Sequence, residues 1–435
     1  MRLKSSKMLV VPVIILFATT VVGCADLGQR EASGAGYVSQ TASSAATGGS
    51  KTASAVPEPV SAVVSTATLA ATGDLLMHDP ILTNNYDEQT GSYDFSGIFT
   101  YIKPYVQKYD FAVANLEVTL AGNDRIPYRG YPCFNCPDEI VDAAKDAGFD
   151  MLLTANNHSN DSGLNGILRT AAVLAQKNMG YTGTRHSEQE KPYRIQNVNG
   201  INIGMMNYTY ESRRAGDKRY LNVMLEQRAI PLVNSFSYGD LDSFYDEVKT
   251  RINQMKEEGA DALVLFIHWG DEYKLTPNNT QKKIARKMCE LGIDVIIGGH
   301  PHVIQPLEII KSVDGRHTTV CLYSTGNAVS NQRIYRASIK TGHTEDGILF
   351  IVTFSKYRDG RVEVTGLDAL PTWVHLYKQN GREAFQIVPL DVSGDLKNKF
   401  GLQYSEDGFE NAMKSYQRTM AIVKDGLKEF EKLAA

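Results

Sequence analysis

Two patterns of hydrophobic and polar residues alternate along the chain. Short apolar runs rich in β-branched residues are typical of buried strands, and longer stretches with an apolar residue every three or four positions are typical of amphipathic helices. Strands are predicted at residues 67–72, 110–114, 149–154, 260–267 and 293–297, and helices at 138–147, 163–177, 241–258 and 277–291. Because strands and helices alternate, the pattern predicts parallel strand pairing and an α/β fold.

Three hairpins and a long helix complete the predicted elements. Residues 193–198 and 201–208 flank Asn199-Gly200, the clearest hairpin signal, and similar pairs flank Asp314-Gly315 and Arg358-Asp359-Gly360. Residues 406–433 are amphipathic, which predicts either a packing helix or a contact with a partner. The basic segment 211–239 is either a substrate-facing insertion or, more commonly for such a composition, a solvated loop.

Polar side chains follow the predicted strands at the points where the apolar runs stop. Open α/β sheets place their sites at these carboxyl ends, so we expect one shared site. The residues concerned are Asp74, His78, Glu117, Asn157, His158, His268, His300 and His302. Taken alone, Asp74 and His78 would fit a helix N-cap followed by a surface histidine.

This set offers oxygen and imidazole donors without thiolates, which suits a pair of divalent ions such as Mn, Fe, Zn or Mg. Two such ions need a bridging carboxylate, for which Asp74 and Glu117 are the candidates, and they lower the pKa of a bound water to roughly 7. His158 is the candidate proton donor, and Glu272 is a spare acid that suits amide chemistry. The predicted reaction class is metal-assisted hydrolysis, acyl transfer or phosphoryl transfer.

The N-terminus predicts secretion. Basic residues precede an apolar run at 8–22 that is shorter than the roughly 20 residues needed to span a bilayer. The run ends in Val21-Val22-Gly23-Cys24, which resembles the bacterial lipobox, so residues 1–24 are predicted to be a lipoprotein signal peptide with lipidation at Cys24. The alternative is an uncleaved anchor with an incidental cysteine. Residues 25–66 are poor in large apolar side chains and predict a flexible tether.

Composition narrows the function classes. A chain of 435 residues is long enough for one large domain or two, and a formal net charge of −4 gives no basic field for nucleic acid. Cys133 and Cys136 form a C-x-x-C without a second ligand pair nearby, which favours a local disulfide over zinc. Cys289 and Cys321 are predicted to be small core residues.

The motifs at the strand ends look like those of the CapA family of capsule and poly-γ-glutamate synthesis proteins, also called PgsA. They are Gly73-Asp74 with His78, Asn115-Leu116-Glu117, Ala155-Asn156-Asn157-His158, His268-Trp269-Gly270-Asp271-Glu272-Tyr273 and Gly299-His300-Pro301-His302-Val303. That family is similar to the calcineurin-like metallophosphatases, so the resemblance implies a four-layer α-β-β-α sandwich of metallophosphatase type. It also implies metal-ligand positions at Asp74, Glu117, Asn157, His268, His300 and His302, with His158 as the catalytic acid.

The chain departs from these patterns in places. Asp74 and His78 stand four positions apart where the phosphatase pattern has two, and Glu117 stands where an aspartate usually bridges the metals. The family-like domain is predicted at residues 67–374, followed by a C-terminal extension at 375–435 that ends in the amphipathic helix.

The resemblance implies an extracytoplasmic lipoprotein of the cell membrane that works on an anionic surface polymer, chiefly poly-γ-glutamate. The preferred hypothesis is a metal-dependent hydrolase or transferase acting on bonds in that polymer. Its rival is a binding or scaffold subunit, in contact with the other subunits of a membrane synthesis and export complex.

Overall fold

The computed structural model describes residues 62–335, 340–379 and 381–434. The chain divides into a unit of residues 1–57 and a unit of residues 58–435, and only the second contains described residues. The predicted signal peptide, Cys24 and nearly all of the predicted tether therefore lie outside the described residues. No helix in the described part combines the length and the apolar character needed to cross a membrane.

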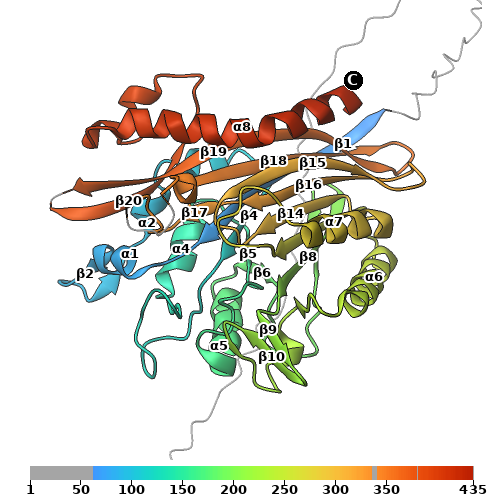
Figure 1. Ribbon diagram of the computed structural model, residues 1–435, viewed down its shortest axis with the longest axis horizontal. Coiled ribbons are helices and arrows are strands. Elements are labelled where there is room, and N and C mark those ends of the chain that lie inside the picture. The colour runs from blue at the N-terminus through green and yellow to red at the C-terminus, as the bar shows by residue number, and fades with distance from the viewer. Residues whose placement is uncertain (1–61, 336–339, 380, 435) are drawn as a thin grey trace, which may run out of the picture. The chain divides into compact units, whose positions relative to one another are not determined.

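The first of two central sheets has the strand order β20-β19-β18-β1-β4-β5-β6, and β17 also pairs with β1 (Figure 1). The strands are β1 Val63–Leu75, β4 Phe111–Leu116, β5 Met151–Leu153, β6 Gly180–Thr182, β17 Asn327–Val329, β18 Asp346–Tyr357, β19 Val362–Gln379 and β20 Arg382–Pro389. The strands β1, β4, β5 and β6 are parallel, whereas β18, β19 and β20 continue the sheet in antiparallel pairs. The carboxyl ends of the parallel strands therefore lie at one edge.

The second sheet has the order β12-β8-β13-β14-β16-β15, with β7 paired to β8. Its strands are β7 Arg194–Val198, β8 Ile201–Tyr210, β12 Ser235–Phe236, β13 Ala262–His268, β14 Val295–Gly299, β15 Ile304–Lys311 and β16 Thr318–Thr325. The strands β8, β13, β14 and β16 are parallel. The predicted hairpins β7–β8 and β15–β16 are both confirmed.

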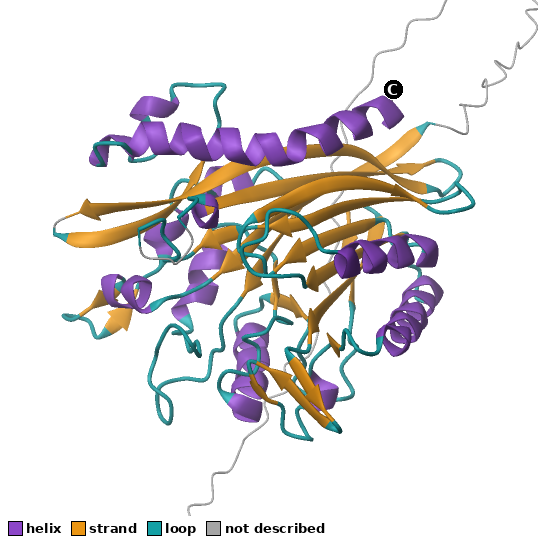
Figure 2. Ribbon diagram, in the orientation of Figure 1, coloured by secondary structure: helices purple, strands orange, loops and turns teal. Residues whose placement is uncertain are grey.

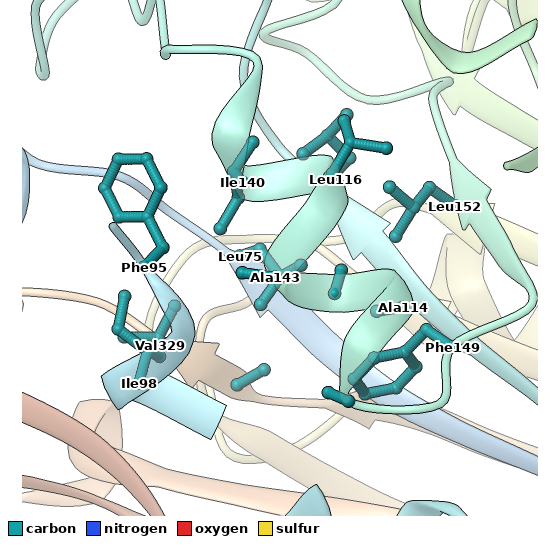
Figure 3. Close-up of a cluster of buried hydrophobic side chains, with 14 of the residues drawn as sticks. Leu75, Phe95, Ile98, Ala114, Leu116, Ile140, Ala143, Phe149, Leu152 and Val329 are labelled. Carbon is teal, nitrogen blue, oxygen red and sulfur yellow. The ribbon is translucent and has the colours of Figure 1, made fainter. Parts of the chain in front are cut away.

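The two sheets pack face to face, and helices cover their outer faces (Figure 2). The strand β4 is covered on both faces: Val113 faces the core between the sheets, whereas Ala112 and Ala114 face the helices. Its sequence is therefore a continuous apolar run. Figure 3 shows Ile140 and Ala143 of α4 beside the strands of the first sheet. The predicted four-layer α-β-β-α architecture is confirmed.

The helices divide between the two outer layers. The layer on the first sheet contains α1 Asp79–Asn84, α2 Ser96–Phe99, α3 Lys103–Val106, α4 Glu139–Asp146 and α5 Gly163–Gln176, and the layer on the second contains α6 Leu241–Glu257 and α7 Asn279–Leu291. A short hairpin, β2 Tyr86–Asp87 with β3 Ser92–Tyr93, and the 3-10 turns His343–Glu345, Leu396–Asn398 and Leu402–Tyr404 lie in connections.

The long helix α8 Gly408–Ala434 packs along β15 and β19 (Figure 1). Its Val423 and Phe430 join the core between the sheets. Arg418 donates from Nε and Nη2 to the two carboxylate oxygens of Asp346, at 2.7 and 2.6 Å. The helix is therefore a packing helix. The predicted boundary between residues 374 and 375 falls inside β19, so the residues after it complete the first sheet and its cover.

Several other features of the structure differ from the sequence-based predictions. The strand β1 begins at Val63 rather than at residue 67 because its first residues pair with β18. Cys133 and Cys136 are free thiols in the structure and not the predicted disulfide, and Cys136 is buried among apolar side chains. Cys289 and Cys321 are core residues, as predicted.

The segment 211–239 is not a solvated loop. It forms a three-stranded sheet of β9 Arg213–Ala215, β10 Lys218–Leu221 and β11 Val223–Met224, followed by the 3-10 turn Ile230–Leu232 and β12. Leu221 and Leu225 are buried against Leu164 and Ile167 of α5, which anchors the segment to the fold.

Candidate metal centre

The strand ends converge on one buried cluster. Asp74 lies in β1, Glu117 follows β4, and Asn157 follows β5, all in the first sheet. His268 ends β13, and His300 and His302 follow β14, all in the second sheet. Each of these side chains belongs to a residue that is exposed by 4% or less. The structure thus brings together six residues that were predicted as ligands.

Two groups of side chains within this cluster can each hold a metal ion. One is Asp74, Glu117 and His268, and the other is Glu117, His300 and His302. In each group the potential ligand atoms lie within 4.8 Å of one another. Glu117 belongs to both groups, so it occupies the position that a bridging carboxylate requires.

Two buried atoms in the cluster lack a hydrogen-bond partner among the described residues. They are Oε1 of Glu117 and Nδ1 of His300. An unpaired buried polar atom costs about 1–3 kcal/mol, so such atoms are normally satisfied. Because both atoms belong to donor types that bind divalent cations, the residues fit a metal ion.

Burial sets the protonation of the ligands. It lowers the pKa of His268 to about 3 and that of His300 well below its ordinary value, and neighbouring histidines add to the second effect. Both imidazoles are therefore neutral, the form that binds metal. Burial and the charge of Asp74 raise the pKa of Glu117. Burial opposes ionisation of Asp74 too, but the hydrogen bond and electrostatic attraction of His302, together with the hydrogen bond from Asn115, outweigh it, so the pKa of Asp74 is lowered.

Amide side chains orient the carboxylates and one imidazole. Asn115 donates from Nδ2 to Asp74 Oδ1 at 2.7 Å and to Glu117 Oε2 at 3.2 Å. Oδ1 of Asn327 lies 3.2 Å from Nδ1 of His302. Such outer residues fix the direction of metal ligands. Sequence reasoning did not assign either asparagine to the site, although Asn115 is the penultimate residue of β4 and Asn327 begins β17, which pairs with β1 at Asp74.

The histidine loop after β14 has an unusual backbone. His300 and His302 have φ of 93° and 54°, in the left-handed region that costs energy for residues other than glycine. Gly298 permits the close approach before them, since a Cβ there would lie 2.0 Å from the carbonyl oxygen of Tyr323. The hydroxyl of Tyr210, which sequence reasoning missed, lies 3.1 Å from Nε2 of His300.

His158 lies beside the cluster and belongs to neither metal group. Its Nδ1 is 2.6 Å from Oδ2 of Asp161, which also accepts the Phe134 backbone N–H at 2.6 Å. Asn222 donates from Nδ2 to Asp161 Oδ1 at 3.2 Å and lies 2.9 Å from the same histidine nitrogen. His158 directly follows Asn157, whose Oδ1 lies 2.8 Å from Nε2 of His268, so the chain places it next to the cluster. With Nδ1 engaged, Nε2 is the nitrogen able to exchange a proton.

Two further predicted site residues, besides His158, lie outside both metal groups. His78 is the N-cap of α1, past the end of β1, and its Nδ1 is 3.3 Å from the backbone nitrogen of Asn331. This predicted ligand therefore belongs to neither ligand group, although its ring and that of His158 both contact Phe134. Glu272 is exposed and directly precedes Tyr273, whose ring centre lies 6.1 Å from that of His302, so it lies near the centre without joining either ligand group.

Together, these features define an α/β sandwich protein in which two sheets build one buried carboxylate and histidine centre suited to divalent cations. Residues 68–332 match the model of a family described as bacterial capsule synthesis protein PGA_cap. The chain belongs to this family, which confirms the identification made from the strand-end motifs.

Two curated relatives illustrate the match. The chain is 30% identical over 300 residues to the PGA biosynthesis protein CapA of Bacillus subtilis (strain 168), covering 68% of this chain and 70% of that protein. It is 27% identical over 272 residues to the capsule biosynthesis protein CapA of Bacillus anthracis, covering 61% of this chain and 60% of that protein. Among solved structures, the sulfate thiohydrolase SoxB of Thermus thermophilus aligns with a TM-score of 0.38 and 12% identity, over 82% of this chain and 60% of that one.

Proposed function

We propose that this protein is a metal-dependent hydrolase or transferase that acts on bonds in poly-γ-glutamate or a similar anionic capsular polymer. The observation that carries the proposal is the buried Glu117, shared by two ligand groups that draw on both sheets. The polymer class is supported by membership of the capsule synthesis family and by the names of the two relatives.

The residues that would hold two ions, of Mn, Fe, Zn or Mg, are the two groups that share Glu117. Asn157 supports them, because its Oδ1 lies 2.8 Å from Nε2 of His268. Ions held here would polarise the scissile carbonyl or phosphoryl group and lower the pKa of an attacking water. The protein contributes the ligand charges, neutral imidazoles and an enclosed site.

His158 supplies the proton for the leaving nitrogen or oxygen. Its Nδ1–H donates to Asp161, so the ring presents Nε2 for proton exchange, and the carboxylate stabilises the protonated ring. Glu272, exposed near the centre, is the second candidate for proton transfer.

The first test is metal analysis of the purified full-length chain, followed by assays on γ-glutamyl and phosphodiester substrates. His158→Ala should retain its metal and lose activity by a factor on the order of 10²–10⁴, the usual contribution of a general acid. His186→Ala changes an exposed histidine and serves as the matched control. A chain that cannot be loaded with metal would rule out this proposal.

One observation favours the rival proposal, a binding or scaffold subunit of a membrane synthesis and export complex that keeps its metal for structure. The ligand residues are exposed by 4% or less, and the cavity lined by Asp74, Asn115 and His268, which does not extend to Glu117, has a volume of only about 20 Å³. This is close to the minimum that holds one water molecule. Stoichiometric metal without turnover on either substrate class would support the scaffold.

We also propose that the chain is a lipoprotein held at the outer side of the cell membrane through Cys24. The support is the signal-like N-terminus and its lipobox-like end. Cys24→Ser should shift the protein from the membrane fraction to the soluble fraction. Full membrane retention of the variant would contradict lipidation.

A further inference from the structure

The small sheet β9–β10–β11 separates its side chains onto two faces. Paired residues in adjacent strands point to the same side, and successive residues in one strand point to opposite sides. Tyr220 pairs with Arg213 and with Met224, and Lys218 pairs with Ala215. These side chains therefore share one face, which we call the cationic face and define by Arg213, Lys218, Tyr220 and Met224.

The opposite face packs inward and its charges are compensated. Leu221 is buried against α5. The guanidinium of Arg219 lies 3.3 Å from Oε1 of Glu211, and that of Arg214 lies 3.7 Å from both Glu211 and Asp240. These arginines therefore serve to anchor the small sheet.

The cationic face lacks such compensation. Arg213 and Lys218 are exposed, and neither forms an ion pair with any residue that the structure describes. The nearby Asp217 lies in the turn between β9 and β10 and pairs with neither of them. The Arg213 guanidinium lies 5.6 Å from the centre of the Tyr220 ring, and Met224 is 44% exposed. The face thus combines two free cations with aromatic and aliphatic surface.

One end of the small sheet is fastened to the candidate proton donor. Asn222, between β10 and β11, reaches Asp161 and His158, as described above. Asn160 donates from Nδ2 to the carbonyl oxygens of Val223 and Met224, at 3.2 and 3.1 Å. The loop that carries His158 therefore also positions β11, and the small sheet extends from it beside α5 (Figure 1).

We propose that the cationic face binds the poly-γ-glutamate chain next to the metal centre, an inference that rests on the proposed function. Each unit of this polymer carries one carboxylate and two methylene groups along its backbone. Carboxylates match Arg213 and Lys218, and methylene groups match Tyr220 and Met224. The turn at Asn222 links the small sheet that carries this face to His158, the candidate proton donor beside the metal centre.

The test measures binding of fluorescein-labelled poly-γ-glutamate to the full-length chain by fluorescence anisotropy. The double variant R213E/K218E should raise the Kd roughly tenfold, since each reversed exposed charge removes an attraction and adds a repulsion. The milder R213Q/K218Q should give an intermediate rise. R316E/K424E makes the same change in net charge at exposed positions outside the small sheet, and it should bind like wild type.

Equal Kd values for wild type and R213E/K218E would overturn the inference, as would equal losses in R213E/K218E and R316E/K424E. Absence of polymer binding by the wild type would overturn it too. The proposed function is tested separately, by metal content and by the loss of turnover in His158→Ala. If the protein binds metal and is active, but its affinity for the polymer is unchanged in R213E/K218E, the proposed function stands and only the polymer-binding role of the cationic face is refuted.

Discussion

The two sheets contribute different chemistry to the candidate metal centre. The first supplies oxygen donors and the second supplies imidazoles. The oxygen donors are Asp74, Glu117 and Asn157, and the imidazoles are those of His268, His300 and His302. Neither sheet alone carries a complete ligand group, so the centre exists only because the sheets pack against each other.

This division has an electrostatic consequence. Within the first sheet, burial and then the charge of Asp74 raise the pKa of Glu117. Across the sheets the groups are complementary: Nδ1 of His302 lies 3.1 Å from Oδ2 of Asp74, and Nε2 of His268 lies 3.3 Å from Oε1 of Glu117. These contacts between carboxylates and imidazoles offset part of the cost of burying two carboxylates side by side. A cation bound by Glu117 would offset more of that cost.

The largest effect should come from loosening the contact between the sheets. Phe350 lies in the core between them, whereas Phe149 lies in the helix-covered core of Figure 3, and both are nearly fully buried. Each change to alanine should lower the free energy of unfolding by ~3–5 kcal/mol, measured by urea denaturation. Only Phe350→Ala should also weaken metal binding, measured by titration, because only that cavity lets the ligand sets shift apart. Equal metal affinities in the two variants would show that packing between the sheets does not set the geometry of the ligand groups.

Removing the shared ligand should have the next largest effect. Glu117→Gln should weaken metal binding by at least ~100-fold, because both ligand groups lose a carboxylate. The metal-free variant should unfold at no lower temperature than the metal-free wild type, because the substitution removes a buried charge repelled by Asp74.

The metal should therefore raise the melting temperature of the wild type and not that of Glu117→Gln, as linkage between binding and folding requires. Calorimetry of the wild type and of Glu117→Gln, each with and without a chelator, measures these four melting temperatures. A metal-free Glu117→Gln that melts well below the metal-free wild type would show instead that Glu117 stabilises the fold by itself.

The sequence predicted the ligands at strand ends because two strong signals coincide there. A buried strand reads as an apolar run, and its carboxyl end in a parallel sheet has a fixed place in the fold. His268 ends β13 directly, so its position followed from the strand. The position of His78 could not be inferred in the same way, because β1 ends at Leu75 and the chain turns into α1 before the histidine side chain is placed. Spacing along the sequence does not give the direction of a side chain beyond the strand.

Contacts from distant, weakly patterned segments were not predictable. Asn222 sits between two short strands of a charged segment, and only its tertiary contacts bring it to His158. The strand β20 is likewise defined by its pairing with β19 and not by its own composition. In both cases the position depends on long-range packing, which local periodicity does not encode.

The smallest effect we predict tests whether the second sheet orients its histidines from outside the ligand set. Tyr210 ends β8, with its hydroxyl 3.1 Å from Nε2 of His300 and its ring 4.7 Å from the imidazole. Tyr210→Phe keeps the ring contact and removes the hydrogen bond, so metal affinity should fall about tenfold, the usual effect of an outer residue. Tyr208→Phe, on the same strand, removes a buried hydrogen bond to Glu247 away from the cluster and should leave metal affinity unchanged. Each variant should lose about 1 kcal/mol of stability, so a difference in metal titration alone isolates the orienting role. If both variants bind metal like wild type, the strained loop at His300 and His302 holds the imidazoles without help from β8.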